Sequence, residues 1–260
     1  MSSKTYPSLS FENELWNKGF RFVIGMDEVG RGAIAGPVAV GVAILDKNAL
    51  GVTTPWPEKL CDSKLISEKV RNEIVDDVRE WVQGSAVGMV SANAIDANGI
   101  IHSLALAGSI ALDGILLDNP SLREAIARDG AVIILDGSHN WIGPKASGMD
   151  VVVRTKADRD CVSVAAASVV AKVERDNHMI QLSSSLDGYG LDGHKGYASA
   201  SHIAAVRSLG PSPQHRLTWL TKILATDPDP SEAVSNEAVS NEALSNEAVS
   251  NEAVSNRAVG

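Results

Sequence analysis

The sequence predicts an α/β protein with a mixed sheet flanked by helices, followed by C-terminal helices and a disordered repeat tail. Three observations carry this prediction. Apolar, β-branched runs of strand length occur twice within residues 21–45 and once each at residues 85–91, 131–135 and 151–155. Helical periodicity separates the later runs, so three antiparallel strands would be followed by helix–strand–helix–strand. From Ser231 a five-residue unit repeats, and it forms no helix face and buries no core.

The stretch at residues 21–45, RFVIGMDEVGRGAIAGPVAVGVAIL, predicts a strand, a turn and a second strand. Its first apolar run ends at the acids Asp27 and Glu28, and valines spaced two apart mark the second run. Neighbouring strand residues point to opposite faces, so both carboxylates reach one metal ion only if the strand bends there. The turn has the freedom for such a bend because it contains Gly30, Gly32 and Gly36.

An acidic pair beside a turn is more often solvated than functional. Here an apolar strand enters the pair and a glycine-rich turn leaves it, which favours a site where the backbone approaches a ligand. The segment GRGAIA at residues 30–35 also fits the dinucleotide-binding pattern G-x-G-x-x-A. That pattern must open a helix, whereas Pro37 and a valine-rich strand follow here, so we reject a dinucleotide site.

Helices are expected before, between and after the strands. The first contains Leu15 and Trp16 and is capped by Ser8 or Ser10, and the next is capped by Ser67. The remaining expected segments are a helix at 92–117 with weak points at Gly99 and Gly108 and an end at Pro120, helices at 162–186, at 199–209 and near Trp219, and a glycine-rich loop at 188–199.

Acids stand at the ends of three separate predicted strands. Asp27 and Glu28 follow the first, Asp136 follows residues 131–135, and Asp158 follows residues 151–155. Clustered carboxylates repel one another unless a cation is present, and hard oxygen ligands suit Mg²⁺ or Mn²⁺. Two such ions about 4 Å apart can activate water and stabilise the leaving oxygen of a phosphodiester. The acids therefore predict a divalent-metal site.

Composition and charge say more about the cellular compartment of the protein than about its binding partner. The net charge is −9, of which residues 227–260 contribute −6, so the remaining −3 neither supports nor excludes nucleic acid. Cys61 and Cys161 form no close-spaced pair, which fits a reducing compartment. The N-terminus lacks the apolar core of a signal peptide. Polar residues interrupt the apolar stretch 100–117, so this stretch predicts a buried helix rather than a membrane span. We expect a cytoplasmic protein that does not associate with a membrane.

The motif MDEVGRGAIAGPV, residues 26–38, resembles the first motif of ribonuclease HII, the type 2 ribonuclease H family, and the resemblance covers about residues 20–220. It implies a ribonuclease-H-like fold for a catalytic domain at 1–226. The resemblance does not extend to residues 227–260, whose composition and repeat predict an acidic linker and a disordered tail. It also implies a monomeric endonuclease that hydrolyses the RNA strand of RNA/DNA hybrids. Such an enzyme cuts 5′ of ribonucleotides embedded in duplex DNA by two-metal-ion catalysis with Mn²⁺ or Mg²⁺, leaves 3′-hydroxyl and 5′-phosphate ends, and serves ribonucleotide excision repair.

The resemblance assigns the catalytic and metal-binding acids residue by residue. Asp27 and Glu28 match the opening acid pair of the family, and Asp136 in ILDG matches its strand-end aspartate. Asp158 in KAD matches the fourth acid, and we prefer it to Asp160, which lies two residues further on.

The same resemblance implies the substrate contacts. Gly30, Arg31 and Gly32 match the glycine-arginine-glycine motif that reads a ribose 2′-hydroxyl through backbone groups. Tyr197 in HKGY matches the tyrosine that stacks on the sugar after the junction, although such a residue can also cap a loop. Lys64 in DSK is the expected phosphate contact.

Several residues stay open at this point. Leu65 stands where the family usually has a second lysine, which predicts a weaker or missing basic contact. Asp176 matches a further family acid and is either a group behind the metal ligands or a surface helix charge. His215 and Arg216 resemble a family element without a clear role. The remaining histidines are expected to be solvated or structural, namely His102, His139, His178, His194 and His202.

Two other functions compete with this interpretation. One is another metal-dependent nuclease or phosphotransferase with the same fold, and the glycine-arginine-glycine turn and Tyr197 argue against it. The other is a non-catalytic duplex-binding protein with structural Ca²⁺, and the complete set of four acids argues against it.

Deleting residues 231–260 is expected to leave cleavage of a ribonucleotide-containing duplex unchanged or slightly faster. The repeat has no metal-ligand set and one basic residue, Arg257, whereas phosphate binding depends on lysine and arginine. Any gain should shrink as salt is added, because exposed charges are screened within about 8 Å at physiological ionic strength. Cleavage rates across a salt series measure this, and a large salt-independent loss would contradict it.

Overall fold

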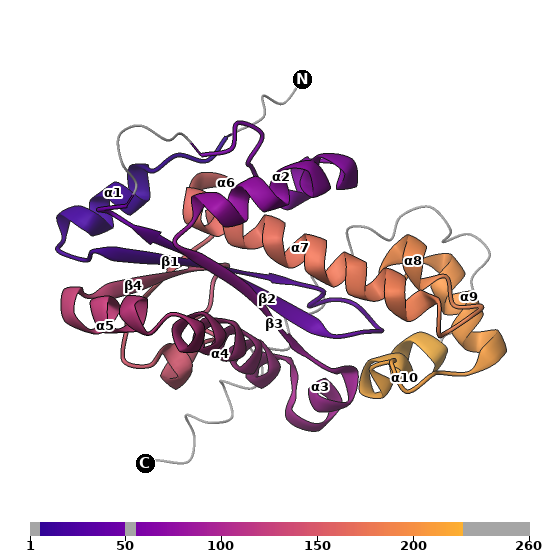
Figure 1. The fold of residues 1–260 in the computed structure, drawn as a ribbon. Helices are drawn as coiled ribbons and strands as arrows, with labels where there is room; N and C mark the ends of the chain where they lie inside the picture. The colour runs from indigo at the N-terminus through magenta and orange to yellow at the C-terminus, as the bar shows by residue number, and fades with distance from the viewer. Residues whose placement is uncertain (1–5, 50–55, 226–260) are drawn as a thin grey trace, which may run out of the picture.

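The computed structural model describes residues 6–49 and 56–225. The strands among these residues are β1 (Phe22–Val29), β2 (Val38–Asp46), β3 (Gly84–Val90), β4 (Ala131–Asp136) and β5 (Asp150–Arg154). They form one sheet in the order β3-β2-β1-β4-β5, which crosses the middle of the molecule in Figure 1. β2 is antiparallel to β1 and β3, whereas β4 is parallel to β1 and β5. The expected mixed sheet is therefore confirmed.

Helices cover both faces of this sheet. Within the described part of the chain they are α1 (Ser10–Asn17), α2 (Glu68–Trp81), α3 (Ala92–Asn98), α4 (Ile100–Asp118), α5 (Pro120–Asp129), α6 (Ala157–Asp160), α7 (Val162–Ser183), α8 (Leu191–His194), α9 (Ala200–Leu209) and α10 (Leu217–Ala225), with 3-10 turns η1 (Ser63–Leu65) and η2 (Gly143–Ala146). Figure 1 shows α7 and α2 on one side of the sheet and α4 and α5 on the other. The helices α8, α9 and α10 gather at the C-terminal end of α7.

The side chains of β1 alternate between two hydrophobic cores. Phe22, Ile24 and Met26 pack with residues of α4, and Val23 packs with residues of α7. The first half of α7, VSVAAASVVA, is buried throughout, as its small residues predict. The helix therefore lies directly on the sheet.

Two glycines make this close approach possible. A Cβ atom on Gly25 of β1 would overlap the backbone of Ser163, and one on Gly41 of β2 would overlap the carbonyl of Ala167. Both obstacles are backbone atoms of α7, which no side-chain rotation can move. The distance between α7 and the sheet thus depends on glycine at these two positions.

The first strand is longer than expected. β2 pairs with β1 through Asp27 and Glu28 as far as Val29, whereas the parallel pairing with β4 stops at Met26. The prediction that the strand ends at the acids is therefore right on the β4 side and wrong on the β2 side. Gly30, with φ of 76°, ends the strand.

The helix expected at residues 92–117 is two helices, α3 and α4. They meet at Gly99, which has φ of 80° and which the sequence marks as a weak point. Pro120 does end α4, but it also opens α5, which the sequence analysis missed, with Asn119 as the cap. The short helix α8 lies inside the glycine-rich stretch that was expected to be a loop.

The predicted helix caps are partly confirmed. The side chain of Ser67 caps α2 by accepting a hydrogen bond from the backbone of Val70. For α1 the prediction is wrong, because Leu9 occupies the capping position and no side chain caps the helix.

Among the described residues, α4 alone is long and apolar enough to cross a membrane, judged by length and composition. Its buried residues, which include Leu104 and Leu112, pack on the sheet against β2 and β3. The expectation of a buried helix is therefore right for the face that lies on the sheet, whereas Ile101, Ile110 and Leu117 on the same helix are exposed. The predicted acidic linker and repeat tail at 227–260 lie outside the described residues.

Replacing Gly41 by alanine is expected to destabilise the fold by roughly 1–3 kcal/mol or more, the usual cost of overpacking a core. Gly114→Ala is the matched control, because a Cβ there meets no atom within 4 Å and α4 would gain about 1 kcal/mol of helix propensity. Urea unfolding midpoints measure both effects. Equal midpoints for the two variants would show that α7 does not depend on this contact.

Candidate active site

Asp27 and Asp136 lie on the two central parallel strands at the same end of the sheet. The register pairs Met26 of β1 with Leu135 of β4, so these acids are the next residues along both strands. Adjacent strands are about 4.8 Å apart, so the two carboxylates emerge side by side. Asp158 lies in α6, just after the neighbouring strand β5. Asp27 and Asp158 are both buried.

Glu28 starts from the opposite face of β1 to Asp27, because side chains alternate along a strand. Its Oε1 atom forms an ion pair with Nη1 of Arg31 at 3.4 Å. Its Oε2 atom is buried and has no hydrogen-bond partner among the residues that the structure describes. One oxygen of Glu28 is thus free to accept a bond from a ligand.

The ammonium group of Lys64 faces the acids. Its Nζ atom lies 3.5 Å from Oδ2 of Asp158. Burial opposes the charged form of Lys64, but the carboxylates of Asp27, Asp158 and Asp136 raise its pKa above the ordinary value. The same lysine acts on the titration of Glu28. The four predicted acids therefore share one electrostatic environment.

Burial and mutual repulsion raise the pKa of three of these acids. Burial, and then the charge of Glu28, raises the pKa of Asp27 well above its ordinary value. Burial also raises the pKa of Glu28, and Asp136 adds to this shift. Burial followed by the charge of Asp136 raises the pKa of Asp158 to about 6. Such shifts are typical of clustered carboxylates with too little positive charge around them.

The donor chemistry at this site fits a divalent cation. Carboxylate oxygens are the ligands that Mg²⁺ and Mn²⁺ prefer, and the unpartnered Oε2 atom of Glu28 is one of them. Within residues 6–49 and 56–225, however, no three acidic, histidine or cysteine side chains are arranged to hold a metal ion. In the present arrangement, Lys64 supplies positive charge beside Asp158.

The surroundings of Asp158 and Asp160 favour Asp158 as the fourth acid of the site. Asp160 pairs with Arg154 at 3.0 Å, and 40% of its side chain is exposed. Asp158 faces Lys64, and 5% of its side chain is exposed.

The turn that carries Lys64 is held by α2 and α7. Arg71 of α2 donates hydrogen bonds to the carbonyls of Ser63 and Ile66 at 2.7 and 2.6 Å. Asp176 of α7 pairs with Arg71 at 3.7 Å and is buried. The reading of Asp176 as a surface charge is therefore wrong, and its contact positions the arginine that holds the turn.

Two fully buried arginines hold the glycine turn. Arg216 donates to the carbonyls of Gly30 and Arg31 at 2.6 and 2.7 Å, and Arg175 donates to the carbonyl of Pro37 at 2.9 Å. A Cβ atom on Gly30 would overlap the guanidinium of Arg175, and its φ of 76° also favours glycine. The role left open for Arg216 is thus to fix the backbone of this turn.

Tyr197 faces the same turn. Its hydroxyl accepts a hydrogen bond from the backbone N–H of Gly30 at 3.2 Å, and the guanidinium of Arg175 lies 5.6 Å from its ring centroid. About a third of Tyr197 is exposed, 36% in all. Gly32 has no atom within 4 Å of a Cβ position, so the turn is open there. The structure thus brings together the turn and the tyrosine that the sequence singled out.

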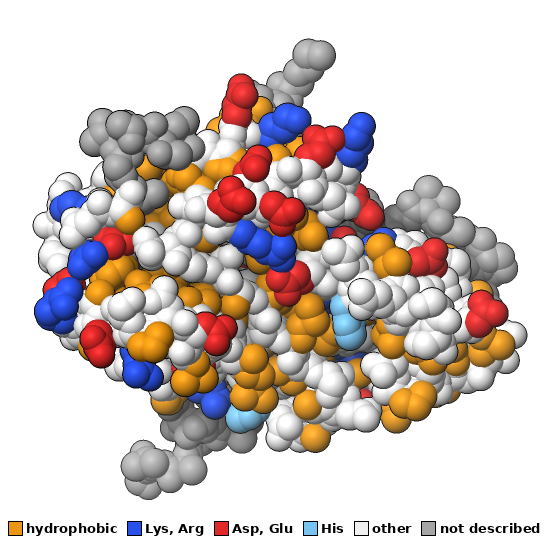
Figure 2. Space-filling model, viewed as in Figure 1, with side chains coloured by type: hydrophobic (Ala, Val, Ile, Leu, Met, Phe, Trp, Pro, Cys, Tyr) orange, Lys and Arg blue, Asp and Glu red, His pale blue; other side chains and the backbone are white. Residues whose placement is uncertain are grey.

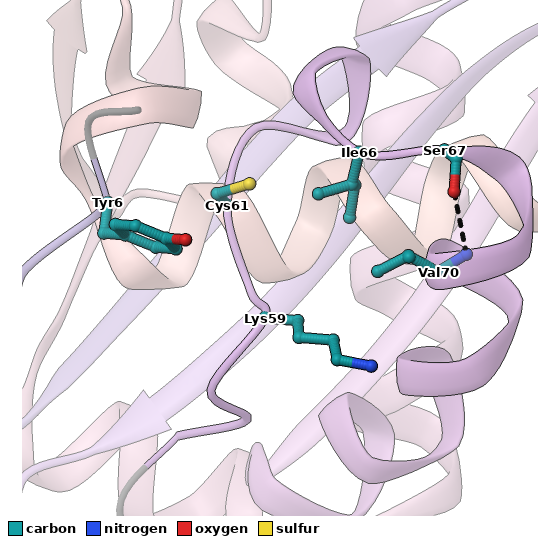
Figure 3. A pocket seen from close by; sticks show the side chains of 6 residues that line it. All are labelled: Tyr6, Lys59, Cys61, Ile66, Ser67 and Val70. Atoms are coloured by element: carbon teal, nitrogen blue, oxygen red, sulfur yellow. Dashed lines mark hydrogen bonds between the residues drawn. The ribbon is translucent and has the colours of Figure 1, made fainter. Parts of the chain in front are cut away.

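The pocket in Figure 3 is separate from the acids. It has a volume of about 300 Å³ and is lined by Tyr6, Lys59, Cys61, Ile66, Ser67 and Val70. None of the four acids lines it. Cys61 and Cys161 are both free and buried, as the absence of a close-spaced pair predicts.

The face of the molecule in Figure 2 carries acidic and basic side chains mixed over α2. On this face the described residues form no continuous basic surface. Leu65 is exposed, so the turn presents an apolar side chain next to Lys64.

Arg71 and Arg175 are functional residues that were not predicted from the sequence. Arg175 follows Ser168 by seven residues and precedes Met179 by four, which places a charge on the buried stripe of a long helix. That position was the available signal for a buried, hydrogen-bonded arginine. Arg71 carried the same kind of signal, because it precedes Ile74, Val75 and Val78 by three, four and seven residues on the buried stripe of α2.

The family described as Ribonuclease HII matches residues 24–222. The ribonuclease HII of Streptomyces avermitilis is 41% identical over 201 residues, which cover 77% of this chain and 78% of that protein. The ribonuclease HII of Thermus thermophilus is 36% identical over 79% of this chain and 89% of that protein. The crystal structure of ribonuclease H2 from Pyrococcus horikoshii superposes with a TM-score of 0.55 and 25% identity, covering 78% of this chain and 96% of that one.

The mixed sheet and these relatives define the class as nucleases with a ribonuclease-H-like fold. More narrowly, the chain belongs to the ribonuclease HII family, whose members cleave RNA in RNA/DNA hybrids.

Adding Mn²⁺ or Mg²⁺ is expected to raise the thermal unfolding midpoint of the protein, because a cation would relieve the repulsion between the acids. At about 100 times the dissociation constant the stabilisation is roughly 2.7 kcal/mol, or roughly 5–10 °C for a chain of this size. Asp27→Asn should lose most of this rise. Asp150→Asn, at the exposed start of β5, is the matched control. An equal rise in both variants would place the cation elsewhere.

Proposed function

We propose that this chain is a divalent-metal-dependent endonuclease that cuts on the 5′ side of ribonucleotides embedded in duplex DNA, besides cleaving the RNA strand of hybrids. The observation that carries the proposal is the shared environment of the acids from β1, β4 and α6, next to the turn that Tyr197 contacts. One group of residues suits phosphodiester chemistry, and the adjacent one suits recognition of a sugar.

Asp27, Glu28, Asp136 and Asp158 are the proposed catalytic residues and metal ligands. The raised pKa values of Asp27, Glu28 and Asp158 support this role, because they record a negative charge that the protein alone does not compensate. Two Mn²⁺ or Mg²⁺ ions bound there would activate water and stabilise the leaving oxygen. Lys64, which already faces carboxylates, would contact a phosphate of the substrate.

The glycine turn is the proposed reader of the ribose. The N–H of Gly30 already bonds to a hydroxyl group, that of Tyr197, so the turn offers donors of the kind that a 2′-hydroxyl requires. The charged donors of Arg216 hold the backbone of Gly30 and Arg31 in place. A preorganised backbone loses little entropy on binding. The exposed ring of Tyr197 would stack on the following sugar.

The bond changes are those of simple hydrolysis. Water adds across the bond between phosphorus and the 3′ oxygen of the preceding nucleotide. The upstream strand therefore ends in a 3′-hydroxyl, and the ribonucleotide keeps a 5′-phosphate. We propose that the protein performs this step as a cytoplasmic monomer in ribonucleotide excision repair.

A labelled DNA duplex with one ribonucleotide tests the proposal. In Mn²⁺ or Mg²⁺ we expect one product, cut on the 5′ side of the ribonucleotide, with no cleavage in EDTA and none of an all-DNA duplex. Asp27→Asn should lower the rate by roughly a thousandfold or more, since losing several kcal/mol of charge stabilisation costs tenfold per 1.4 kcal/mol.

Asp150→Asn is again the control and should cleave at the wild-type rate. Circular dichroism would establish that the Asp27→Asn protein is folded. Full activity of a folded Asp27→Asn variant would place the chemistry elsewhere. Cleavage on the 3′ side would contradict the proposed bond.

A further inference from the structure

Behind Tyr197 lies a cluster of histidines that the proposed chemistry does not use. His202 and His215 are fully buried, and their Nε2 atoms lie 3.0 Å apart. The ring of His194 stacks on His202, with centroids 4.1 Å apart. His202 was expected to be solvated or structural, and its burial supports the structural alternative.

The backbone donors around this pair determine where its protons sit. The N–H of Ser212 donates to Nδ1 of His215 at 3.0 Å, so Nδ1 is bare and a neutral His215 carries its proton on Nε2. That proton points to His202, whose Nε2 must then accept. A neutral His202 is left with its proton on Nδ1, 2.8 Å from the carbonyl oxygen of Tyr197. One tautomer of each ring satisfies every contact.

This directed chain runs from Ser212 through His215 and His202 to the backbone of Tyr197, and we call it the histidine relay. His194 stands beside the relay rather than in it. Its Nδ1 accepts from the N–H of Gly196 at 3.2 Å, so its Nε2 donates to the carbonyl of Tyr189 at 2.8 Å.

The surroundings keep the relay neutral. Burial lowers the pKa of His202 to about 4 and lowers that of His215 as well, and His194 adds to both shifts. The groups that face the pair are the ring of His194, the ring of Tyr189 at 5.0 Å from His215, the backbone and hydroxyl of Ser212 and the carbonyl of Tyr197. None of these is a carboxylate. Protonation would bring two N–H donors together across 3.0 Å.

The relay joins the two sides of the proposed ribose reader. His215 forms a backbone bridge with Ala35, and the following N–H of Arg216 donates to the carbonyl of Ile34 at 2.8 Å, so one end is attached to the glycine turn. At the other end, His202 donates a hydrogen bond to the carbonyl of Tyr197. The hydroxyl of Tyr197 in turn accepts a hydrogen bond from the N–H of Gly30. The contacts form a closed loop from the turn to the tyrosine and back.

We propose that His202 and His215 are positioning residues, which fix Tyr197 against the glycine turn through this neutral relay. Uptake of a proton by the pair breaks the hydrogen bond between the rings, while Nδ1 of His202 still donates to the carbonyl of Tyr197. Where activity is measured, the inference rests on the proposed function. The proton positions on His202 and His215 can be tested independently of the proposed function.

Nitrogen-15 NMR of the histidine side chains tests the relay without substrate. At pH 7.5 we expect His202 with its proton on Nδ1, and His215 and His194 with theirs on Nε2. Both relay histidines should titrate below the ordinary pKa of about 6.5. Because the unfolded chain binds these protons more readily, stability should fall as the pH drops from about 6.5 toward 4. The opposite tautomer of His202, or its titration near 6.5, would overturn the relay.

Two substitutions of His202 separate the halves of the relay. In His202→Asn the amide nitrogen takes the place of Nδ1 and keeps the bond to the Tyr197 carbonyl. In His202→Gln the amide reaches the place of Nε2 and keeps the contact with His215, but it loses Tyr197. We expect KM for the ribonucleotide duplex to rise roughly fivefold in the glutamine variant and less than twofold in the asparagine variant, with kcat nearly unchanged. Equal effects in two folded variants would overturn the proposal.

A double-mutant cycle with Tyr197→Ala tests whether His202 acts through the tyrosine. When the Tyr197 ring is absent, its position no longer affects substrate binding. His202→Gln should therefore change KM less than twofold in the Tyr197→Ala background. Independent, additive losses would overturn the positioning role. If the wild-type protein does not cut the ribonucleotide duplex, the proposed function fails, and the NMR measurement still decides the relay.

Discussion

The close approach of α7 to β1 and β2 is the constraint on which the rest of the structure depends. Gly25 and Gly41 leave no side chain between the sheet and the helix backbone. Because α7 lies so close, the hydroxyl of Ser168 reaches both the carboxylate of Asp27 and, at 2.8 Å, the hydroxyl of Ser63. Further along the same helix, Arg175 reaches the glycine turn. One packing distance therefore sets the position of the acids, the lysine turn and the proposed ribose reader.

The arginines beneath the glycine turn illustrate how a buried charge is tolerated. An isolated charge in a protein interior is strongly unfavourable, but hydrogen bonds to every side of the guanidinium offset much of that cost. Arg216 donates to the carbonyls of Gly30, Arg31 and Gly36. Burial lowers its pKa to about 9, so it remains protonated at neutral pH. Glycine allows the φ of 76° at residue 30, and the charged donors of Arg216 hold the turn in that conformation.

The acids of the site raise a different electrostatic problem, because they carry like charges that repel one another. Burial and repulsion raise the pKa of Asp27 and Glu28, and Lys64 offsets only part of this. A site with such uncompensated charge is held together by the fold around it. Glu12 is a buried acid outside this group, and its Oε1 atom accepts hydrogen bonds from the backbone and hydroxyl of Ser163 at the start of α7, both at 2.9 Å. Burial nevertheless raises its pKa.

The sequence by itself determined the sheet, most helices and the strand origins of the acids, because hydrophobic periodicity and glycine are local properties of a chain. It did not determine that β1 continues past the acids, since β2 supplies the pairing from across the sheet. The roles of Arg71, Arg175 and Arg216 were beyond it, because each donates to carbonyls brought near only by folding. The proton positions of His202 and His215 were likewise decided by tertiary structure, since the backbone N–H of Ser212 and the carbonyl of Tyr197 fix them from two different segments.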